Sequence, residues 1–395
     1  MLSKKVVIVS AVRTPIGGFL GSLKSISQID LAGLVIQEAV NRANVEKSLV
    51  DEVIVGNVGQ IAESGFIARA ASIKAGLPLS TTSYSVNRQC GSGLQSIVDA
   101  ALLIATDNAE ICVACGTENM SQLPFYLKGA RTGMKMGHSV LEDGLLDILT
   151  WPLGPFHNGL TAENVAEKYH ITRDMQDNFA VLSQTRAIEA IDQGRFEDQI
   201  LPVEIINKKE TILFSTDEYP RRGLTLENLS RLRPAFVESG SVTAGNSSGI
   251  NDGAAAVVMM SEDKARELGY KEWMTFVDYA VAGNEPEYMG FAPTLSTTKL
   301  LERHSMKVAD LDLVELNEAF ASQSVAVIQA LGLDEEKTNV NGGAIALGHP
   351  VGATGCVLPV KVYYELKRRK KQLGLVTMCI GGGQGISALF RYEGI

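Results

Sequence analysis

The amino-acid sequence predicts an α/β protein built from two similar halves. Short apolar runs alternate with segments whose apolar residues recur at helical spacing, which is typical of an α/β chain. The run Val50-Asp-Glu-Val-Ile-Val55 is matched by Leu311-Asp-Leu-Val-Glu-Leu316 at an offset of 261 residues, and Cys115 aligns with Cys379 at an offset of 264. Near-constant offsets over several elements indicate a duplicated unit. A loop-rich stretch over 119–250 interrupts the rhythm and is predicted to be an insertion.

The elements of the first half follow in order from local signals. Val6–Ser10 and Glu52–Val55 are apolar runs of strand length, and Ser27 is a capping residue for a helix that ends near Ala43. A short strand at Tyr84–Val86 leads into a helix that begins at Cys90 or Gly91. Ile111–Cys115 then reads as a buried strand.

The insertion and the second half are justified in the same way. In the insertion we expect helices near 161–169 and 173–193, the second ended by Gly194, and a small hairpin of Val203–Ile206 and Thr211–Phe214. In the second half the predicted strands are Trp273–Val281, Leu313–Leu316 and Leu375–Ile380, with helices over 293–304 and after Gly352.

A chain of 395 residues is too long for one ordinary core, so two or three domains are expected. We predict an N-terminal half of residues 1–118 plus 251–270, a loop domain of 119–250 that binds the ligand and covers the site, and a C-terminal half of 271–395.

Composition excludes several classes of protein. The net charge of −9 argues against general nucleic-acid binding, which needs a basic face. Residues 207–235 nevertheless carry six basic side chains against four acidic ones, which is either a solvated surface or an anion site. The apolar N-terminus stops at Arg13 without a cleavage signal, and no stretch is long and apolar enough to span a membrane. Five cysteines do not form a disulfide framework, so a cytoplasmic protein is expected.

Two cysteines and a histidine lie in glycine-rich settings: Cys90 before Gly91-Ser-Gly93, His349 between Gly348 and Pro350, and Cys379 before Gly381-Gly-Gly383. A nucleophilic thiol needs a nearby base and close backbone N–H donors, and glycine lets the backbone approach a substrate. Cys90 at a helix N-terminus is expected to have a lowered pKa. The plain alternative for each cysteine is a small buried core residue.

Four further motifs are more simply explained without a catalytic role. Asn317 follows a strand, where a lone asparagine is usually a helix cap. Gly91-Ser-Gly93-Leu-Gln-Ser96 approaches a dinucleotide fingerprint but lacks its third glycine. Cys112-Val-Ala-Cys115 has metal or redox spacing inside an apolar strand without a second pair, so buried structural cysteines are expected, and Lys367–Lys371 fits a helix C-terminus.

Four motifs together resemble the signatures of the thiolase family, in order and at the expected spacing. They are Asn87-Arg-Gln-Cys-Gly-Ser-Gly-Leu94, Asn317-Glu-Ala-Phe-Ala321, Gly342-Gly-Ala-Ile-Ala-Leu-Gly-His-Pro350 and Cys379-Ile-Gly-Gly-Gly-Gln-Gly385, and the segment 243–255 resembles a further one. The similarity covers nearly the whole chain and is greatest to the biosynthetic branch, the acetyl-CoA acetyltransferases. It implies a five-layered α-β-α-β-α fold of two similar halves with an inserted loop domain.

The resemblance also implies roles for individual residues. Cys90, helped by His349, would carry an acetyl group from acetyl-CoA, and Cys379 would deprotonate a second acetyl-CoA to give acetoacetyl-CoA and CoA. His349 with a water held by Asn317 would form one oxyanion hole, and the N–H groups of Cys90 and Gly381 the other. The implied contacts to substrate and CoA are Arg221 at the adenine end, then Ser248, Ala244, Phe236, His157, Met289, Leu149, Ala319 and Phe320.

The resemblance implies no metal or organic cofactor, and a homo-oligomer that is a tetramer or a dimer. The chain departs from the family pattern at Phe156-His-Asn158-Gly, where biosynthetic thiolases usually have methionine in place of Asn158, and at 62–69, a segment often at subunit contacts. The first departure leaves acyl specificity open, and the second leaves assembly open.

Alternatives remain in two classes. One is a degradative 3-ketoacyl-CoA thiolase of longer acyl chains, which Asn158 motivates. The other is a non-catalytic protein that binds acyl-CoA or senses redox state through Cys90 and Cys379. Ketoacyl synthases share the fold but commonly lack a second catalytic cysteine, so Cys379 argues against them.

Overall fold

The computed structural model describes residues 4–60, 62–206 and 210–394. Its main feature is a mixed sheet with the strand order β14-β15-β16-β13-β1-β12-β5-β3-β4, to which β2 is added beside β12. The strands of the first half are β1 (Val6–Arg13), β2 (Gly17–Gly18), β3 (Glu52–Gly56), β4 (Thr82–Val86), β5 (Ile111–Asn119) and β12 (Asn251–Ser261). Those of the second half are β13 (Trp273–Gly283), β14 (Leu313–Leu316), β15 (Leu373–Ile380) and β16 (Gln384–Glu393).

The two halves repeat one pairing pattern. In the first half β3 pairs parallel with β5, β5 antiparallel with β12, and β12 antiparallel with β1. In the second half β14 pairs parallel with β15, β15 antiparallel with β16, and β16 antiparallel with β13. The predicted duplication is therefore confirmed. Residues 6–8 at the start of β1 bond both β12 and β13 and so join the halves into one sheet.

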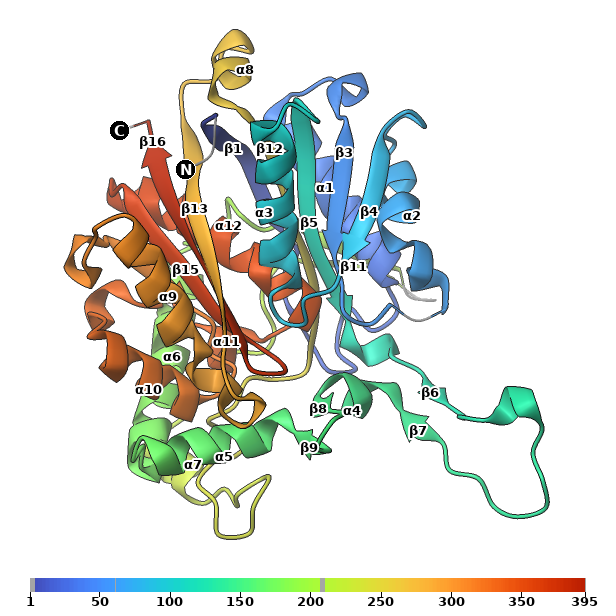
Figure 1. Cartoon of the computed structure of the whole chain (residues 1–395), viewed down its shortest axis with the longest axis vertical. Helices are drawn as coiled ribbons and strands as arrows, with labels where there is room; N and C mark the ends of the chain where they lie inside the picture. The colour runs from blue at the N-terminus through green and yellow to red at the C-terminus, as the bar shows by residue number, and fades with distance from the viewer. Residues whose placement is uncertain (1–3, 61, 207–209, 395) are drawn as a thin grey trace.

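Helices separate and cover the two halves, which gives five layers (Figure 1). On the outside of the first half lie α1 (Gln28–Ala43) and α2 (Ile67–Lys74), and on the outside of the second half α9 (Ala292–Arg303) and α10 (Ala321–Leu331). The central layer is α3 (Ser92–Ala105) and α12 (Val351–Arg369), which share one apolar core with strands of both halves. The five-layered α/β fold expected from the sequence is confirmed.

Glycines allow the two central helices to touch along their backbones. A Cβ on Gly93 of α3 would lie 2.6 Å from the backbone nitrogen of Cys356, and one on Gly355 of α12 would lie 2.3 Å from that of Leu94. Backbone atoms cannot rotate away as side-chain ends can, so both positions require glycine. Cys90 and His349 each lie just before one of these helices, so this crossing helps to set how far apart they are.

The segment between β5 and β12 packs over the second half and contributes an extended arm (Figure 1). Its strands are β6 (Phe125–Tyr126), β7 (Glu142–Asp143), β8 (Thr150–Trp151), β9 (Phe156–His157), β10 (Val203–Ile206) and β11 (Thr211–Phe214). Its helices are α4 (Gly144–Ile148), α5 (Asn158–Lys168), α6 (Arg173–Asp192) and α7 (Leu226–Ser230). The remaining helices of the chain described by the structure are α8 (Glu262–Glu267) and α11 (Ala344–Leu347). The predicted domain boundaries stay a prediction.

Local expectations agree with the structure within a few residues. Ser27 caps α1 by accepting the N–H of Asp30, and the hairpin β10–β11 has the predicted bounds. Cys112 and Cys115 are fully buried in β5, as structural cysteines should be. Within the described ranges no helix has both the length and the apolar character needed to cross a bilayer.

Candidate active site

Cys90 lies on a tight turn between β4 and α3. Gln89 before it has a left-handed backbone with a φ of 46°, which is uncommon for a residue with a side chain. Local hydrogen bonds hold the turn: Asn87 Oδ1 accepts the Gln89 N–H at 3.0 Å, and Ser92 Oγ accepts the Arg88 N–H at 2.9 Å. The turn therefore fixes the thiol at the start of the central helix layer, as nucleophiles on strand-to-helix turns are fixed elsewhere.

His349 lies in the short connection between α11 and α12. Gly348 has a φ of 106°, and a Cβ on it would lie 2.5 Å from Cγ of Asn251. Because glycine leaves that space open, the Asn251 side chain reaches the loop, and its Oδ1 accepts the backbone N–H of His349 at 2.9 Å. Asn251 Nδ2 in turn donates to the carbonyl of Gly17 at 3.0 Å. One buried amide of β12 thus ties the histidine loop to the first half.

The partners of the imidazole determine which nitrogen carries the proton. Thr354 Oγ1 lies 2.6 Å from Nδ1 of His349 and donates its single proton to the Pro350 carbonyl at 2.9 Å. With the Thr354 proton on the Pro350 carbonyl, Nδ1 is the donor to Oγ1, and Nε2 is the unprotonated nitrogen. Asn317 Nδ2 donates to Nε2 at 3.4 Å. Burial lowers the pKa of His349 to about 4, so the ring is a neutral base at pH 7.

Cys379 ends β15 and lies behind the cavity wall. It is fully buried in an apolar cluster with Met289, Ala319 and Phe320. Burial, and secondly the nearby Cys90, raise the pKa of its thiol above the usual range. A Cβ on Gly91 would lie only 2.9 Å from Cδ1 of Ile380, so the fold brings the two cysteine-bearing segments together from opposite halves of the chain.

The expected lowering of the Cys90 pKa is wrong. Burial raises the pKa of this thiol to about 11, although N–H groups of Gly381 and of Cys90 itself bond the sulfur and act in the opposite direction. Helix α3 begins only at Ser92, and the cost of desolvating a buried thiolate is larger than the stabilisation that the positive end of the helix gives it. The Cys90 and His349 pair is accordingly neutral at rest.

Asn317 is not the helix cap that a lone asparagine usually is. Phe320 occupies the N-cap position of α10, and Asn317 instead turns its amide toward His349. Its Oδ1 is buried and has no hydrogen-bond partner among the described residues. The side chain therefore has one acceptor left for a further polar group beside His349.

These residues border a cavity of about 380 Å³ that runs from Cys90 to the surface. A volume of this size suits a small-molecule ligand. The lining includes eleven of the residues expected from the sequence: Cys90, Leu149, His157, Arg221, Phe236, Ala244, Ser248, Met289, Ala319, Phe320 and His349. The other three do not line the cavity but contact residues that do. Asn317 bonds His349, Gly381 bonds Cys90, and Cys379 packs in the cluster of Met289, Ala319 and Phe320.

Aromatic rings form one side of the cavity and a cation marks its opening. The rings of His157 and Phe236 stack with centroids 5.1 Å apart, and Phe236 meets the edge of Phe320 at 6.1 Å. His157 Nδ1 accepts the Gly159 N–H at 3.0 Å, and burial lowers the pKa of this ring. At the exposed end the guanidinium of Arg221 lies 5.4 Å from the ring centroid of Tyr219.

Only part of the basic stretch 207–235 faces the cavity. Arg222 forms an ion pair with Asp192, and Arg231 pairs with Glu227 on the surface. Lys208 and Lys209 lie outside the described residues. Arg221 is the basic side chain of this stretch that lines the cavity. Among the described residues of this stretch, the predicted anion site is therefore represented by Arg221.

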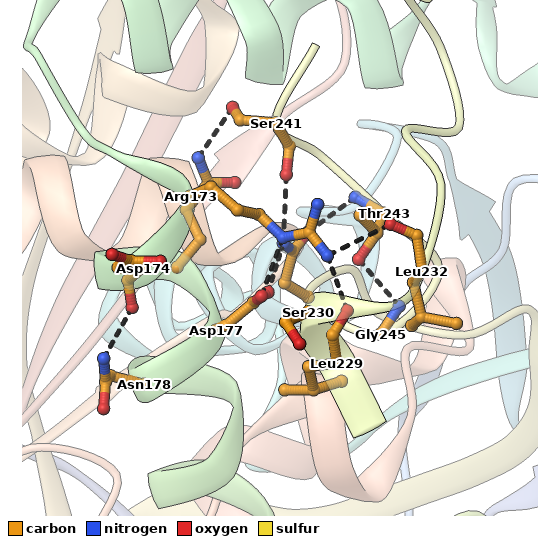
Figure 2. A network of polar contacts seen from close by, with 12 residues as sticks. Arg173, Asp174, Asp177, Asn178, Leu229, Ser230, Leu232, Ser241, Thr243 and Gly245 are labelled. Atoms are coloured by element: carbon orange, nitrogen blue, oxygen red, sulfur yellow. Dashed lines mark hydrogen bonds and ion pairs between the residues drawn. The ribbon is translucent and has the colours of Figure 1, made fainter. Parts of the chain in front are cut away.

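A polar network holds the cavity wall against α6 (Figure 2). Figure 2 shows Arg173 and Asp177 of α6 directed toward the segment that contains Ser241, Thr243 and Gly245. Arg173 Nε donates to Asp177 Oδ2 at 2.7 Å, and the other carboxylate oxygen accepts Asn246 Nδ2 at 2.9 Å. The segment has almost no regular structure, so side-chain contacts of this kind must define its path.

Sequence reasoning missed several lining or supporting residues. Met120, Tyr219, Ser247 and Val351 line the cavity, and Thr354 and Asn251 orient His349. Thr354 carried a signal, because it stands five residues after His349 at the start of a glycine-rich helix. Asn251 carried none, since its contact with His349 joins positions 98 apart in sequence.

The site has the chemistry of thiols and a neutral imidazole. Among the described residues no group of three or more metal-binding side chains comes together. Two buried thiols, a neutral base and backbone N–H donors at the end of a cavity define a cysteine-dependent site for acyl chemistry at the junction of a duplicated α/β fold.

Comparisons with known proteins agree with this class. Residues 6–263 match the model of the thiolase N-terminal domain, and residues 270–392 match that of the thiolase C-terminal domain. This chain belongs to the thiolase family. It is 49% identical over 390 residues to the acetyl-CoA acetyltransferase of Escherichia coli, with 98% of this chain and 99% of that protein covered.

Two solved structures extend the comparison. The Bacillus anthracis acetyl-CoA acetyltransferase is 45% identical and superposes with a TM-score of 0.97, with 99% of each chain covered. Human mitochondrial 3-ketoacyl-CoA thiolase is 40% identical with a TM-score of 0.95, again over 99% of each chain.

Proposed function

We propose that the protein is an acetyl-CoA C-acetyltransferase, which condenses two acetyl-CoA to acetoacetyl-CoA and CoA and also catalyses the reverse thiolysis. The observation that carries the proposal is the meeting of two buried cysteines from opposite halves, whose neighbours Gly91 and Ile380 pack together, with a neutral imidazole at the end of one cavity. Its relatives in Escherichia coli and Bacillus anthracis carry the name of this activity.

In the first half-reaction Cys90 attacks the thioester carbonyl of acetyl-CoA. Its proton passes to Nε2 of His349, the nitrogen that the Thr354 contact leaves unprotonated and that accepts a long hydrogen bond of 3.4 Å from Asn317. The C–S bond to CoA breaks, and the departing sulfur takes the proton of the Cys379 thiol, which leaves acetyl-Cys90, free CoA, a Cys379 thiolate and a protonated His349. The resting pair is neutral, with a thiol pKa of about 11 and an imidazole pKa of about 4, so charge develops only when the substrate is in place.

In the second half-reaction Cys379, as the thiolate, removes a proton from the methyl group of a second acetyl-CoA. The resulting carbanion attacks the acetyl carbonyl on Cys90, and the bond to the Cys90 sulfur breaks to release acetoacetyl-CoA. Cys379 is a thiol again after it has taken this proton, and the released Cys90 sulfur takes the proton held by His349, so both thiols and the imidazole return to their neutral resting state. N–H groups at Cys90 and Gly381 would stabilise one oxyanion, and His349 with a group bound at Asn317 Oδ1 would stabilise the other.

The rest of the cavity is suited to CoA. Phe236, Ala244 and Ser248 form a narrow wall for the pantetheine arm, and Arg221 lies at the opening, where the phosphates and adenine would bind. We assign no metal or organic cofactor, since the CoA thioesters are themselves the substrates.

The first experiment measures CoA-dependent loss of acetoacetyl-CoA by the purified protein, with Cys90→Ala as control. Rapid loss by the wild type alone supports the proposal. Loss that persists in Cys90→Ala contradicts the assigned nucleophile. Acetylation of Cys90 by acetyl-CoA without any loss of acetoacetyl-CoA would favour another acyl chain.

The second candidate is a 3-ketoacyl-CoA thiolase of longer chains, which the likeness to the human mitochondrial enzyme favours. Thiolysis rates across acyl-chain lengths separate the two functions, because the longer-chain enzyme would prefer medium chains. A non-catalytic, acyl-CoA-binding or redox-sensing protein would bind CoA without turnover or would respond to oxidation of Cys90 and Cys379.

The proposal extends to assembly and location. The β6–β7 arm exposes Phe125, Met134, Met136, Val140 and Leu141, an apolar surface that favours association into a homotetramer or dimer. The cysteines are free thiols, which suits a reducing compartment such as the cytoplasm.

A further inference from the structure

The outer wall of the cavity is one stretch of chain, residues 217–249, whose regular structure is limited to the single short helix α7. Tyr219 and Arg221 line the cavity near its beginning, and Ala244, Ser247 and Ser248 line it near its end. A wall without regular structure keeps its shape only if side chains tie it to the core. Two buried carboxylates provide such ties.

The first tie is Asp217, which is held by the first strand of the sheet. Arg13 of β1 donates to both of its carboxylate oxygens, at 2.7 and 2.9 Å, and neither side chain is exposed. Asp217 Oδ1 also accepts the N–H of Ile16 at 2.8 Å. The guanidinium is itself fixed by Gln199 Oε1 at 2.8 Å and by the ring of Phe196. A bidentate pair of this kind fixes direction as well as distance.

Glu218 extends the first tie to the turn after β1. Its Oε1 accepts the N–H groups of Gly18 at 2.6 Å and Ser22 at 2.9 Å, and Oε2 accepts the Ser22 hydroxyl at 2.6 Å. Its own N–H donates to the Ile16 carbonyl at 3.2 Å. Residues 217 and 218 are thus docked on the first half immediately before Tyr219 and Arg221 enter the cavity wall.

The second tie is Asp177, on α6 (Figure 2). Through Asn246 it reaches the loop at 243–248, because Asn246 Nδ2 donates to Asp177 and Asn246 Oδ1 accepts the Thr243 N–H at 2.7 Å. Arg173, which Asp177 orients, donates to the carbonyls of Leu229 and Leu232. Asp177 therefore holds the part of the wall that carries Ala244 and Ser248.

We propose that Asp217 and Asp177 are positioning residues for coenzyme A, and that each governs a different part of the ligand. Asp217 positions Tyr219 and Arg221 for the nucleotide, and Asp177 positions Ala244 and Ser248 for the pantetheine arm. Neither carboxylate lines the cavity, so each acts through the residues it holds. The inference rests on the proposed function for the identity of the ligand.

The test compares thiolysis of two acetoacetyl thioesters, one of CoA and one of pantetheine, which lacks the nucleotide. For Asp217→Asn we expect the KM for acetoacetyl-CoA to rise about 10-fold, with kcat and the kinetics of the pantetheine thioester changed by less than about twofold. For Asp177→Asn we expect KM to rise about 10-fold for both thioesters. A variant that merely unfolded would lose kcat on both substrates alike.

Two further variants keep the test independent of folding. Glu218→Ala weakens the first tie without leaving a buried guanidinium unpaired, and it should reproduce the selective loss on acetoacetyl-CoA. Glu227→Gln removes the carboxylate of an exposed ion pair on the same stretch that neither ties the wall nor lines the cavity, and it should change nothing. Equal losses on both thioesters for Asp217→Asn and Glu218→Ala, or unchanged KM values for all variants, would overturn the proposal.

Calorimetric titration with CoA separates this inference from the proposed function. If the wild type binds CoA but does not turn over acetoacetyl-CoA, the proposed function fails, while weaker CoA binding by Asp217→Asn and Asp177→Asn would still support the ties. If CoA affinity is the same in all variants, the ties are not positioning devices.

Discussion

At the scale of single residues, His349 is prepared as a base by one hydroxyl. Thr354 has a single proton and gives it to the Pro350 carbonyl, so it can only accept from Nδ1. Nε2 is then free to take a proton, and burial keeps the ring neutral at pH 7 by lowering its pKa to about 4. The orientation of the base therefore depends on a side chain that does not line the cavity.

Removing that hydroxyl should impair catalysis without abolishing folding. Thr354→Val keeps the shape of the side chain but leaves Nδ1 without an acceptor, so we expect kcat to fall about 10-fold or more with little change in KM. Steady-state thiolysis of acetoacetyl-CoA measures this. Thr354→Ser restores a hydroxyl and should recover most of the rate; a Thr354→Val enzyme with full kcat would contradict the assigned tautomer.

The buried imidazole should also make stability depend on pH. His349 in the unfolded chain binds a proton below pH 6.5, whereas in the folded chain it does so only near pH 4. Its contribution is therefore fully present above pH 6.5 and is lost as the pH falls, by about 2 kcal/mol at pH 5. Urea unfolding at pH 7 and pH 5 should show a smaller loss of stability for His349→Asn than for wild type. Equal losses would show that His349 is not buried as a neutral ring.

Asn158, whose difference from the family's methionine motivated the longer-chain alternative, should instead favour a short acyl group in this structure. Its amide lines the cavity, and Nδ2 lies 3.7 Å from the position that a Cβ would take on Gly381. An alkyl chain that covers this amide removes its water, which costs about 1–2 kcal/mol. We expect kcat/KM for thiolysis to be higher with acetoacetyl-CoA than with a 3-oxohexanoyl thioester. Asn158→Met should lower the ratio of these two kcat/KM values about 5-fold or more, whereas Asn158→Gln should not. A ratio of kcat/KM that is the same in wild type and Asn158→Met would refute this role.

At the scale of elements, the two central helices fix the relation between nucleophile and base. Cys90 lies just before α3 and His349 just before α12, and the helices touch where Gly93 and Gly355 leave no Cβ between them. Two helices from different halves can hold two loops at a constant separation only if their contact is rigid. The packing of α3 against α12 therefore also determines how the nucleophile and the base are placed relative to each other.

A methyl group at this crossing should disturb both stability and rate. In Gly355→Ala the new Cβ would meet the backbone nitrogen of Leu94 at 2.3 Å, so the helices must separate, at a cost of about 1–3 kcal/mol. We expect a lower Tm together with a lower kcat, measured by thermal unfolding and steady-state assays. Gly283→Ala, where a Cβ would have no neighbour within 4 Å, is the matched control and should change neither. A lower Tm with an unchanged kcat would show that the helix crossing does not determine the geometry of the active site.

At the scale of the whole molecule, each half supplies what the other lacks. The first half contributes Cys90, the second Asn317, His349 and Cys379, and the segment between β5 and β12 supplies much of the cavity wall. That same segment extends an arm whose large apolar side chains are exposed in a single chain (Figure 1). Such a surface is costly in water unless another subunit covers it.

Charges on the arm should therefore shift assembly toward smaller species. Met136 and Val140 are largely exposed near the tip of the arm, so Met136→Asp with Val140→Asp should leave the fold of one chain intact while it destabilises subunit contacts. Light scattering on the eluting protein should give a lower mass than for wild type. Lys135→Asp offers a charge-changing control outside the apolar set. An unchanged mass for the double variant would exclude these side chains from the interface.

Much of the site was visible in the sequence because chemistry and backbone geometry restrict residue types locally. Cys90, His349 and Cys379 stand beside glycines that a close backbone approach requires, and the offset of the two halves followed from the periodicity of their strands. The helix α1, its Ser27 cap and the hairpin β10–β11 also followed from local signals. Where neighbours in sequence decide the structure, the sequence is sufficient.

Other features were decided only by the tertiary structure. The pKa of Cys90 is raised rather than lowered, because burial by distant strands and helices outweighs the local helix end. Asn251, Asp217 and Asp177 gave no signal, because their partners named above lie between 69 and 234 residues away, apart from Arg173, which is four residues from Asp177. Desolvation and long-range hydrogen bonds depend on which segments the fold brings together, and no local pattern encodes that.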